Sequence, residues 1–451
     1  MLYSTRGLVK IEQEDLSGAL RDLKKCLQIQ ASNDTCLYNI GYVLYQQGKY
    51  EQSINYFDSA LANNPDNSFY LIARGDAFLE LSHFTLAQKD YRRVLSQDPE
   101  ADLAYYGIAM CHFYQQDYDS AKYYLSNAIA HDPLDSDYYY HRGLCKYLQD
   151  DHSGALKDFD FALELEPENN EARFSRAQLL IENGDYSQAM EDLNLALSLD
   201  SLNIELLNER GTLYLSMGAY EQAAGDFSSI IDSDPLVDVA FYNRGLAHYF
   251  LELPVPAIND FDAAISLNRQ EHDYYLYRAL ALLMAEKSEA ALADFETAIK
   301  IAPENPDAYF KRSMAYFEME DYDSALKDLS EAYRLDPEYP GIFLLRAEIY
   351  SLTDEPDKAL KNYDLAILYN PEDGEAFFKR GIFLYEMDNL SGAMDDFDYA
   401  IALDKSIPAP YTNRGLIRLE LKDKSGACDD WKKAFQLGSA YAQELLKKHC
   451  R

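Results

Sequence analysis

The sequence lacks the features by which membrane-spanning and exported proteins are usually recognised. It contains no run of about 18 apolar residues, so we expect no membrane-spanning helix and no direct membrane insertion. Its first residues, MLYSTRGLVKIEQED, show no basic segment followed by an apolar core. Because this export signal is absent, we expect a cytoplasmic protein.

Cysteine is scarce, and its spacing fits none of the usual arrangements. The chain has 6 cysteines and no C-x-x-C pair. This is a poor disulfide framework for a chain of 451 residues and a poor zinc site. We therefore expect small buried apolar residues or free terminal thiols at Cys26, Cys36, Cys111, Cys145, Cys428 and Cys450.

Basic residues are outnumbered, with 41 Lys and Arg against 77 Asp and Glu and a formal charge of −36. Such a surface repels nucleic-acid phosphate and anionic lipid, so we expect no nucleic-acid partner. The charge suits a basic partner. A simpler explanation is that it keeps the chain soluble.

The motifs of common catalytic sites are also absent. The sequence has no G-x-x-x-x-G-K-[ST], G-x-G-x-x-G, H-E-x-x-H or G-x-S-x-G. Its 8 histidines are scattered, and acidic stretches such as AMDDFDYA (393–400) lack the glycine and oxygen spacing of a calcium loop. We therefore expect a chain that is not an enzyme and that holds no metal and no cofactor.

What the sequence has instead is one 34-residue period. Steps of 34 from Ala19 give alanine at twelve of thirteen sites, and steps from Cys26 give it at ten. Steps from Gly7 give only small residues: Gly7, Gly41, Gly75, Ala109, Gly143, Ala177, Gly211, Gly245, Ala279, Ser313, Ala347, Gly381 and Gly415.

Each period accommodates two helices and a stop signal. Segments such as AFYNRGLAHYFLEL place apolar residues at helical spacing, and the small residues let two helices approach closely. Proline recurs at eight sites in steps of 34, where it ends the second helix. Pro254 and Pro356 instead fall in the first turn of a second helix, where proline is harmless. The sequence thus predicts thirteen stacked helical hairpins.

This pattern resembles the tetratricopeptide repeat family, whose unit is a 34-residue helix–turn–helix. The resemblance covers residues 1–437, with Gly7 at position 8 and a large apolar residue, such as Phe57 or Trp431, at position 24. It implies an all-α fold, an α-α superhelix (solenoid) of stacked hairpins. Residues 438–451 depart from the repeat, and we expect them to form a capping helix that solvates the last hydrophobic face.

The start of the chain has no such cap. Met1 falls inside the first repeat, and Leu2, Leu8 and Val9 have no preceding hairpin to pack against. Either residues are missing at this end or the end docks on another molecule. We favour missing residues.

An arginine occupies position 7 in eleven repeats, and an aspartate follows sixteen residues later in ten. Where Ile40 and Ile108 replace the arginine, Tyr56 and Tyr124 replace the aspartate, so both partners vanish together. We interpret the arginine as a structural ion-pair partner, within its repeat or with the next, because a guanidinium forks onto a carboxylate. The alternative is an anion-binding ladder, which the aspartates would neutralise.

Members of the family commonly bind extended peptides along the concave face, which positions 2, 5, 9, 12 and 13 of the first helix form. None of these sites in any repeat is Lys or Arg here, and acids are interspersed with aromatics. We expect an acidic, aromatic groove for a basic or apolar protein or peptide, held by tyrosine contacts and cation–π attraction. About half of the rings should be core residues. The candidates are Tyr38, Tyr42, Tyr45, Tyr106, Phe113, Tyr114, Tyr140, Tyr147, Tyr242, Tyr249, Phe250, Phe310, Phe317, Phe378 and Tyr385.

The first functional hypothesis is therefore a non-catalytic protein–protein interaction scaffold. The alternative is a regulatory or structural portion of a larger polypeptide or assembly whose N-terminal part is missing. The Lys, Arg and Asn clamp with which co-chaperone members hold the carboxylate of heat-shock chaperones is absent, so that role is disfavoured. The net charge disfavours an RNA reader.

Overall fold

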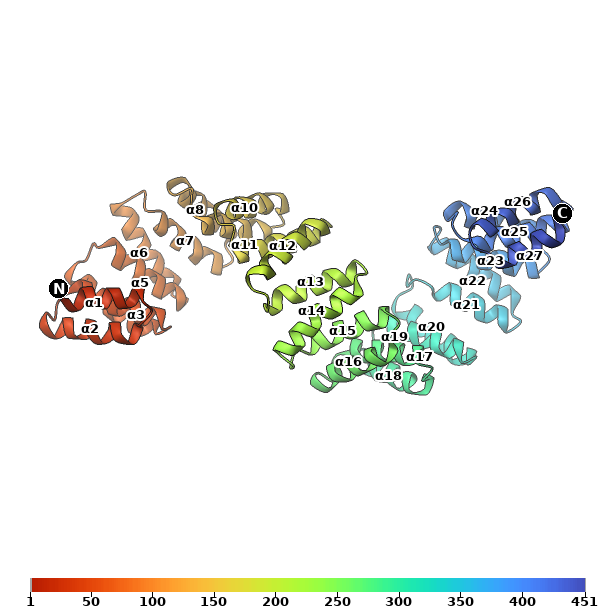
Figure 1. Ribbon diagram of the computed structural model, residues 1–451, viewed down its shortest axis with the longest axis horizontal. Coiled ribbons are helices and arrows are strands. Elements are labelled where there is room, and N and C mark those ends of the chain that lie inside the picture. Colours follow the sequence, from red (N-terminus) through yellow and green to blue (C-terminus); the bar gives the residue numbers. More distant parts are fainter. Residues whose placement is uncertain (1, 451) are drawn as a thin grey trace. The chain divides into compact units, whose positions relative to one another are not determined.

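The computed structural model describes residues 2–450, which are helical almost throughout, with no strand among them. The chain divides into two compact units, the first ending at Gly218 and the second beginning at Ala219. Figure 1 shows the helices of each unit following one another as antiparallel pairs. The all-α fold of stacked hairpins that the sequence predicted is confirmed.

The hairpins follow the chain order, an odd-numbered helix pairing with the even-numbered helix after it inside each unit. The first unit contains α1 Leu2–Glu12, α2 Leu16–Ile29, α3 Asp34–Gln46, α4 Tyr50–Asn63, α5 Ser68–Glu80, α6 Phe84–Gln97, α7 Asp102–Tyr114, α8 Tyr118–His131, α9 Ser136–Tyr147, α10 His152–Leu165, α11 Asn170–Glu182, α12 Tyr186–Leu199 and α13 Ile204–Ser216. The second contains α14 Tyr220–Ser233, α15 Asp238–Phe250, α16 Pro254–Leu267, α17 His272–Met284, α18 Ser288–Ile301, α19 Pro306–Glu318, α20 Tyr322–Leu335, α21 Ile342–Leu352, α22 Pro356–Tyr369, α23 Gly374–Glu386, α24 Leu390–Leu403, α25 Pro408–Glu420, α26 Lys424–Gln436 and α27 Ala440–His449.

Close packing inside a hairpin explains the small residue at position 8. A Cβ atom on Gly41 would lie 2.6 Å from a ring carbon of Phe57, and one on Gly381 would lie 2.7 Å from a ring carbon of Phe397. Both rings are fully buried. The large residue at position 24 therefore takes the space that a side chain at position 8 would need, and this fixes the distance between the two helices.

The turn of every hairpin places one residue, at position 15, in the left-handed backbone region. Glycine occupies this position in three repeats, for example Gly48 with φ of 69°. The other ten repeats have charged or polar residues with φ between 58° and 65°, namely Glu14, Ser82, Gln116, Asp150, Glu252, Glu286, Glu320, Asp354, Asp388 and Lys422. The tertiary packing of the hairpin thus imposes a conformation that most of these side chains do not favour.

The helix boundaries agree with the positions of the prolines in the sequence. Pro254 and Pro356 are the first residues of α16 and α22, as expected, since a first-turn proline removes no helical hydrogen bond. At the C-terminal end, α27 packs on α26 and buries Ala442 and Leu445.

The N-terminal hairpin has an uncovered apolar side. Leu2, Leu8 and Val9 on α1 are all exposed, Leu2 to 76 %. Met1 lies outside the described residues. No helix within residues 2–450 is long and apolar enough to cross a membrane.

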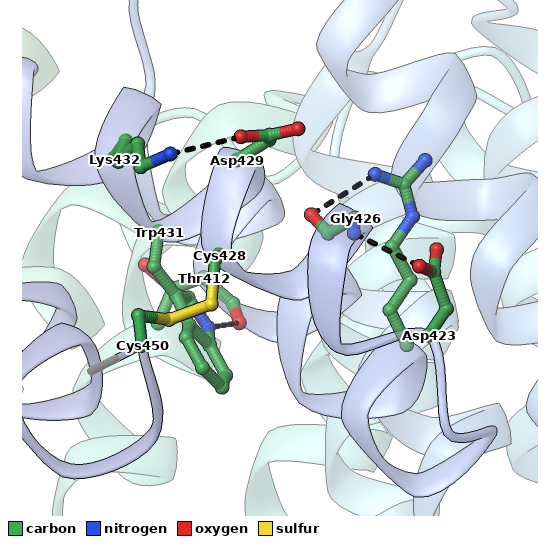
Figure 2. Close-up of a disulfide and its surroundings, with 9 residues drawn as sticks. Thr412, Asp423, Gly426, Cys428, Asp429, Trp431, Lys432 and Cys450 are labelled. Atoms are coloured by element: carbon green, nitrogen blue, oxygen red, sulfur yellow. Dashed lines mark hydrogen bonds and ion pairs between the residues drawn. A yellow bond between two sulfur atoms is a disulfide. The ribbon is translucent and has the colours of Figure 1, made fainter.

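The expectation for the cysteines is wrong at four of the six. Cys26 in α2 is bonded to Cys36 in α3, which joins the first hairpin to the second. Cys428 in α26 is bonded to Cys450 just after α27, as Figure 2 shows. Spacing could not reveal these bonds, because the partners meet only when neighbouring helices stack. The two remaining thiols, Cys111 and Cys145, are free and buried, as expected.

The Trp431 side chain lies beside the second disulfide. It is fully buried, and its indole N–H donates to the Thr412 carbonyl at 3.1 Å (Figure 2). This ring stands at position 24 of the last repeat, so the core pattern of the array continues to the helix that carries Cys428.

Two glycine substitutions should have opposite effects on stability. In Gly381→Ala the new methyl group must displace the buried Phe397 ring, which we expect to lower the free energy of unfolding by about 1–3 kcal/mol. In Gly225→Ala the methyl group meets nothing within 4 Å, so better helix propensity should raise it by up to about 1 kcal/mol. Urea unfolding followed by circular dichroism measures both. Equal stability of the two variants would contradict the packing argument.

Thiol titration should count the disulfides directly. Burial raises the pKa of the Cys111 and Cys145 thiols to about 12, so the native chain should show no fast-reacting thiol with Ellman's reagent. In urea without reductant two thiols should react, and after reduction all 6. Four or more reactive thiols in unreduced urea would show that at least one disulfide is absent.

Candidate functional site

The recurring arginine forms a two-pronged ion pair with the aspartate of its own repeat. In Arg74–Asp90, Nε donates to one carboxylate oxygen and Nη2 to the other, both at 2.7 Å. The paired aspartates are almost fully buried, Asp158 at 2 % exposure. The same fork is described for Arg6–Asp22, Arg142–Asp158, Arg176–Asp192, Arg244–Asp260, Arg278–Asp294, Arg312–Asp328, Arg380–Asp396 and Arg414–Asp430.

The arginine also reaches the preceding hairpin. Arg278 Nη1 donates to Asp262 Oδ1 at 2.5 Å, and its guanidinium lies over the Tyr275 ring, 5.6 Å from the centroid. One side chain thus touches two carboxylates and an aromatic ring on three helices. Of the two pairings that the sequence left open, the one within the repeat is the one observed, and the contact with the preceding repeat goes to a different aspartate, at position 25. Such a contact to an aspartate is also made by Arg74, Arg176, Arg380 and Arg414.

The arginines therefore act as structural partners of carboxylates. The two repeats without the arginine replace it by fully buried Ile40 and Ile108, which need no counter-ion. The mixed repeat is different, because Arg346 faces Asn362 where other repeats have aspartate. Arg346 Nη2 donates to Ser330 Oγ at 2.9 Å, and burial lowers the pKa of its guanidinium.

The fifteen aromatic residues proposed for the groove form what we call the aromatic face, on the first helices of the hairpins. None of the fifteen is buried: Tyr114 and Phe250 are exposed, to 59 % and 47 %, and the other thirteen are half-buried. Most of the half-buried rings nevertheless pack against core clusters, as Tyr38 and Tyr242 do, so the expectation that about half contribute to the core is met by partial and not by full burial. Fully buried rings stand mainly at position 24, where Phe159 and Phe261 have no exposure.

Several members of the aromatic face bond to carboxylates of the next repeat. The Tyr147 hydroxyl donates to Glu182 Oε1 at 2.5 Å, which together with burial raises the pKa of Tyr147 to about 12. Tyr45 bonds to Glu80 at 3.3 Å in the same way, and Tyr385 to Glu420. Some carboxylates of the face are thus held in place by hydrogen bonds from its own tyrosines.

In the first unit, three of these tyrosines line a hollow of about 180 Å³. Tyr38, Tyr42 and Tyr45 come from α3, and Asp76 comes from α5. The remaining lining is apolar, from Phe57, Phe69, Ile72, Ala73 and Leu103. The hollow combines aromatic walls with one carboxylate, which is the composition of a binding pocket for a partly apolar cation.

Asp76 is the acid of this hollow, and its surroundings shift its pKa. The Tyr91 hydroxyl donates to its Oδ1 at 2.7 Å, and no other hydrogen bond to it and no ion pair occurs within the part of the chain that the structure describes. Burial raises the pKa of Asp76 to about 6; the Tyr91 bond opposes this rise and the nearby Glu80 charge adds to it.

A second hollow, of about 300 Å³, lies in the second unit and is lined by Glu348, whose repeat position is that of Asp76, and by Glu386. It opens toward the repeat that follows its position-9 acid, whereas the first hollow opens toward the repeat that precedes Asp76. The Lys379 ammonium lies 2.5 Å from the Glu348 carboxylate, and Tyr363 also lines this hollow. Sequence reasoning noted Asp76 only as one of many acids and missed Tyr91, Tyr363 and Lys379. The sequence did contain a signal for these sites. Tyr91 and Tyr363 are the two tyrosines among the position-24 residues, and their two repeats alone have an acid at position 9.

Comparison with known proteins agrees with the repeat geometry. Sequence profiles of the tetratricopeptide repeat match residues 35–67, then 72–125, 112–160, 149–204 and 257–306, and finally 316–379. These matches together extend over more than half of the chain. The chain belongs to the tetratricopeptide repeat family. Tetratricopeptide arrays are typically non-enzymatic, and the fold is consistent with a protein–protein interaction scaffold.

Curated relatives match only in part. Human tetratricopeptide repeat protein 16 is 26 % identical over 149 residues, 29 % of this chain and 17 % of the relative. The tetratricopeptide repeat and J domain-containing co-chaperone DNJ1 of Fusarium oxysporum is 32 % identical over 76 residues, 17 % of this chain and 15 % of the relative. The match thus spans less than a fifth of each of these relatives.

Solved structures of low sequence identity share the helical architecture. Yeast Tom70 aligns over 91 % of this chain and 93 % of its own, with 18 % identity and a TM-score of 0.47. Cut9, from a Cut9–Hcn1 hetero-tetramer of APC/C, aligns over 99 % and 95 %, with 13 % identity and a TM-score of 0.45.

The ion-pair fork can be tested at Arg312, whose described contacts with carboxylates all go to Asp328. Arg312→Ile should leave the buried Asp328 carboxylate without its partner and lower the local free energy of opening by about 3–5 kcal/mol. The double variant Arg312→Ile, Asp328→Tyr copies the natural Ile108–Tyr124 combination and should recover most of that loss. Hydrogen exchange of α19 and α20 amides measures this opening. The single variant Asp328→Tyr completes the comparison. If the losses of the two single variants simply add in the double variant, the fork has no coupling energy.

Proposed function

We propose that the array is a non-catalytic scaffold that binds a basic or partly apolar peptide segment of another protein along the aromatic face. The observation that carries the proposal is that fifteen first-helix rings remain accessible in a face whose sites include no lysine or arginine. Accessible tyrosines provide large contact area and little entropy loss on binding.

The charge of the chain sets the chemistry of the partner. A net charge of −36 favours encounter with a basic segment and disfavours nucleic acid and anionic lipid. Several acids of the face are already engaged, as Glu182 is by Tyr147, and these are poorer ligands for a partner. Asp76 accepts only one hydrogen bond and is the better counter-ion. No part of the face offers a cationic clamp for a chaperone carboxylate.

The disulfides bear on the compartment. We expected a cytoplasmic protein, but cytosolic thiols are kept reduced, and two disulfides favour an oxidising compartment instead. The scaffold proposal does not depend on the compartment, because the aromatic face contains no cysteine.

Binding to the aromatic face can be tested with a random dodecapeptide library displayed on phage and panned against the full chain. Selected peptides are then synthesised, labelled and titrated by fluorescence anisotropy in about 150 mM salt, where long-range attraction is screened. Each peptide should lose about tenfold or more in affinity with one of two triple variants, Tyr38→Ser, Tyr42→Ser, Tyr45→Ser or Tyr242→Ser, Tyr249→Ser, Phe250→Ser.

The matched control removes exposed rings from second helices. Tyr123, Phe161 and Tyr399 are exposed to 64 %, 49 % and 58 %, and their replacement by serine should change affinity less than about twofold. Circular dichroism confirms that each variant is folded. Peptides that bind both aromatic-face variants as tightly as the unmodified chain, or a library that yields no binding peptide, would overturn the proposal.

A further inference from the structure

We propose that the hollow between α3 and α5 is a receptor for the ammonium group of a partner lysine, with Asp76 as its counter-ion. This inference rests on the proposed function and names the chemistry of one contact within it. The lysine stem would lie along Tyr38, Tyr42 and Tyr45, and its ammonium group would meet the carboxylate at the base of these rings.

No cation of the chain itself serves Asp76. The titratable groups that interact with it are acids, phenols and a thiol, and the Arg92 cation acts on this thiol and not on Asp76. They comprise Tyr38 and Tyr45 on α3, Glu80 on α5, Tyr91 on α6, and Tyr106 and Cys111 on α7. A half-buried carboxylate with one phenolic donor and no positive partner is far from the pairing that buried charges usually show.

In the second unit, the acid at the same repeat position is paired with a lysine. Glu348 follows Asp76 by 272 residues, which is eight steps of 34, and Tyr363 follows Tyr91 by the same interval. There the Lys379 ammonium lies 2.5 Å from Glu348 and 3.1 Å from Glu375. Burial of Lys379 lowers its pKa, but the bonds to the two carboxylates outweigh this, and the net pKa is raised. The chain thus pairs the acid of this repeat position with an ammonium group once already, although Lys379 comes from the following repeat and not from the side of the proposed hollow.

The residue that could supply an internal cation differs between the two acids. Lys379 stands 31 residues after Glu348, at position 6 of its repeat, and the residue 31 after Asp76 is Gly107. A Cβ atom on Gly107 would lie 2.4 Å from the Tyr91 ring, so this ring occupies the space through which an internal lysine would have to pass. The first site therefore has the acid without the built-in cation.

Other occupants fit less well. A divalent metal needs several oxygen ligands from carboxylates or carbonyls, and here a single carboxylate stands among phenols and apolar side chains. A guanidinium forks onto both oxygens of a carboxylate, and the Tyr91 hydroxyl competes with such a fork for one oxygen of Asp76. An ammonium group needs only the other oxygen and the tyrosine rings.

The test uses the full chain and the library-selected peptides that bind it. In each peptide whose affinity falls with the Tyr38→Ser, Tyr42→Ser, Tyr45→Ser variant, every lysine is replaced in turn by norleucine, which keeps the stem and removes the amine. One such replacement should weaken binding about tenfold or more, and so should Asp76→Asn in the protein, which preserves the acceptor of the Tyr91 bond. The two changes together should weaken it no more than either alone.

A charge-matched control separates this contact from general attraction. Glu318→Gln removes an acid from the same set of repeat positions in the second unit and should change the affinity less than about twofold. A thermal unfolding scan shows whether Asp76→Asn is folded. If it is not, the pH dependence of the unmodified chain gives a second test.

The pH dependence follows from the raised pKa of Asp76, about 6. Below that pH the carboxylate is protonated and cannot pair with the amine, so affinity for the lysine peptide should be about tenfold weaker at pH 5 than at pH 7.5. The norleucine peptide should lack this dependence.

The outcomes separate the two proposals. The lysine receptor is overturned, and the scaffold stands, if the peptides bind through the aromatic face but no lysine-to-norleucine replacement weakens their affinity. The same holds if the fold-losses in affinity from norleucine and from Asp76→Asn multiply when the two changes are combined. A lysine peptide whose affinity is the same at both pH values also overturns it. If no library peptide binds the chain, both proposals fall.

Discussion

The fork between an arginine and a buried aspartate is the constraint on which the array depends. A carboxylate exposed to only 2 %, as in Asp158, is tolerated only with a positive partner in place, so the hairpin cannot close in a different register. Because the same guanidinium reaches the preceding hairpin, it also fixes how one repeat stacks on the next. Packing of position 24 against position 8 sets the distance between helices, and the fork sets their relative height.

This rigid frame leaves the first helices free to vary at their accessible positions. Asp76 and Glu348 show what such variation can do. Both repeats have an acid at position 9 and a tyrosine at position 24, but the residue at position 6 of the following repeat differs. In the second unit Lys379 neutralises the acid and makes the site a structural ion pair. In the first, Gly107 leaves the acid among tyrosines with a raised pKa. The acid of a structural ion pair and the acid of a candidate binding site therefore occupy the same repeat position.

The fold could be read from the sequence because its determinants recur thirteen times. Gly41 and Phe57 belong to series whose shared chemistry is visible without coordinates, and so do Arg74 and Asp90. Features that depend on one repeat could not be read in this way. Predicting the Cys26–Cys36 bond requires the distance between two stacked helices. Predicting the Tyr91–Asp76 hydrogen bond requires the orientation of the Tyr91 ring, whose hydroxyl points out of the core. The degree of exposure of each ring of the aromatic face could not be read either, since periodicity places a ring on a helix face but does not give its exposure.

The positions of the two disulfides have a consequence for how the array comes apart. Stacked repeats normally fray from their ends, where a terminal unit has only one neighbour. Here Cys26–Cys36 ties the first hairpin to the second, and Cys428–Cys450 ties α26 to the end of α27. The disulfides therefore keep α2 with α3, and α26 with the end of α27, when these helices open locally. At the repeat of α21 and α22, Asn362 replaces the aspartate of the fork and no described disulfide is present. Local opening should therefore begin more readily in that interior repeat than at the disulfide-linked helices.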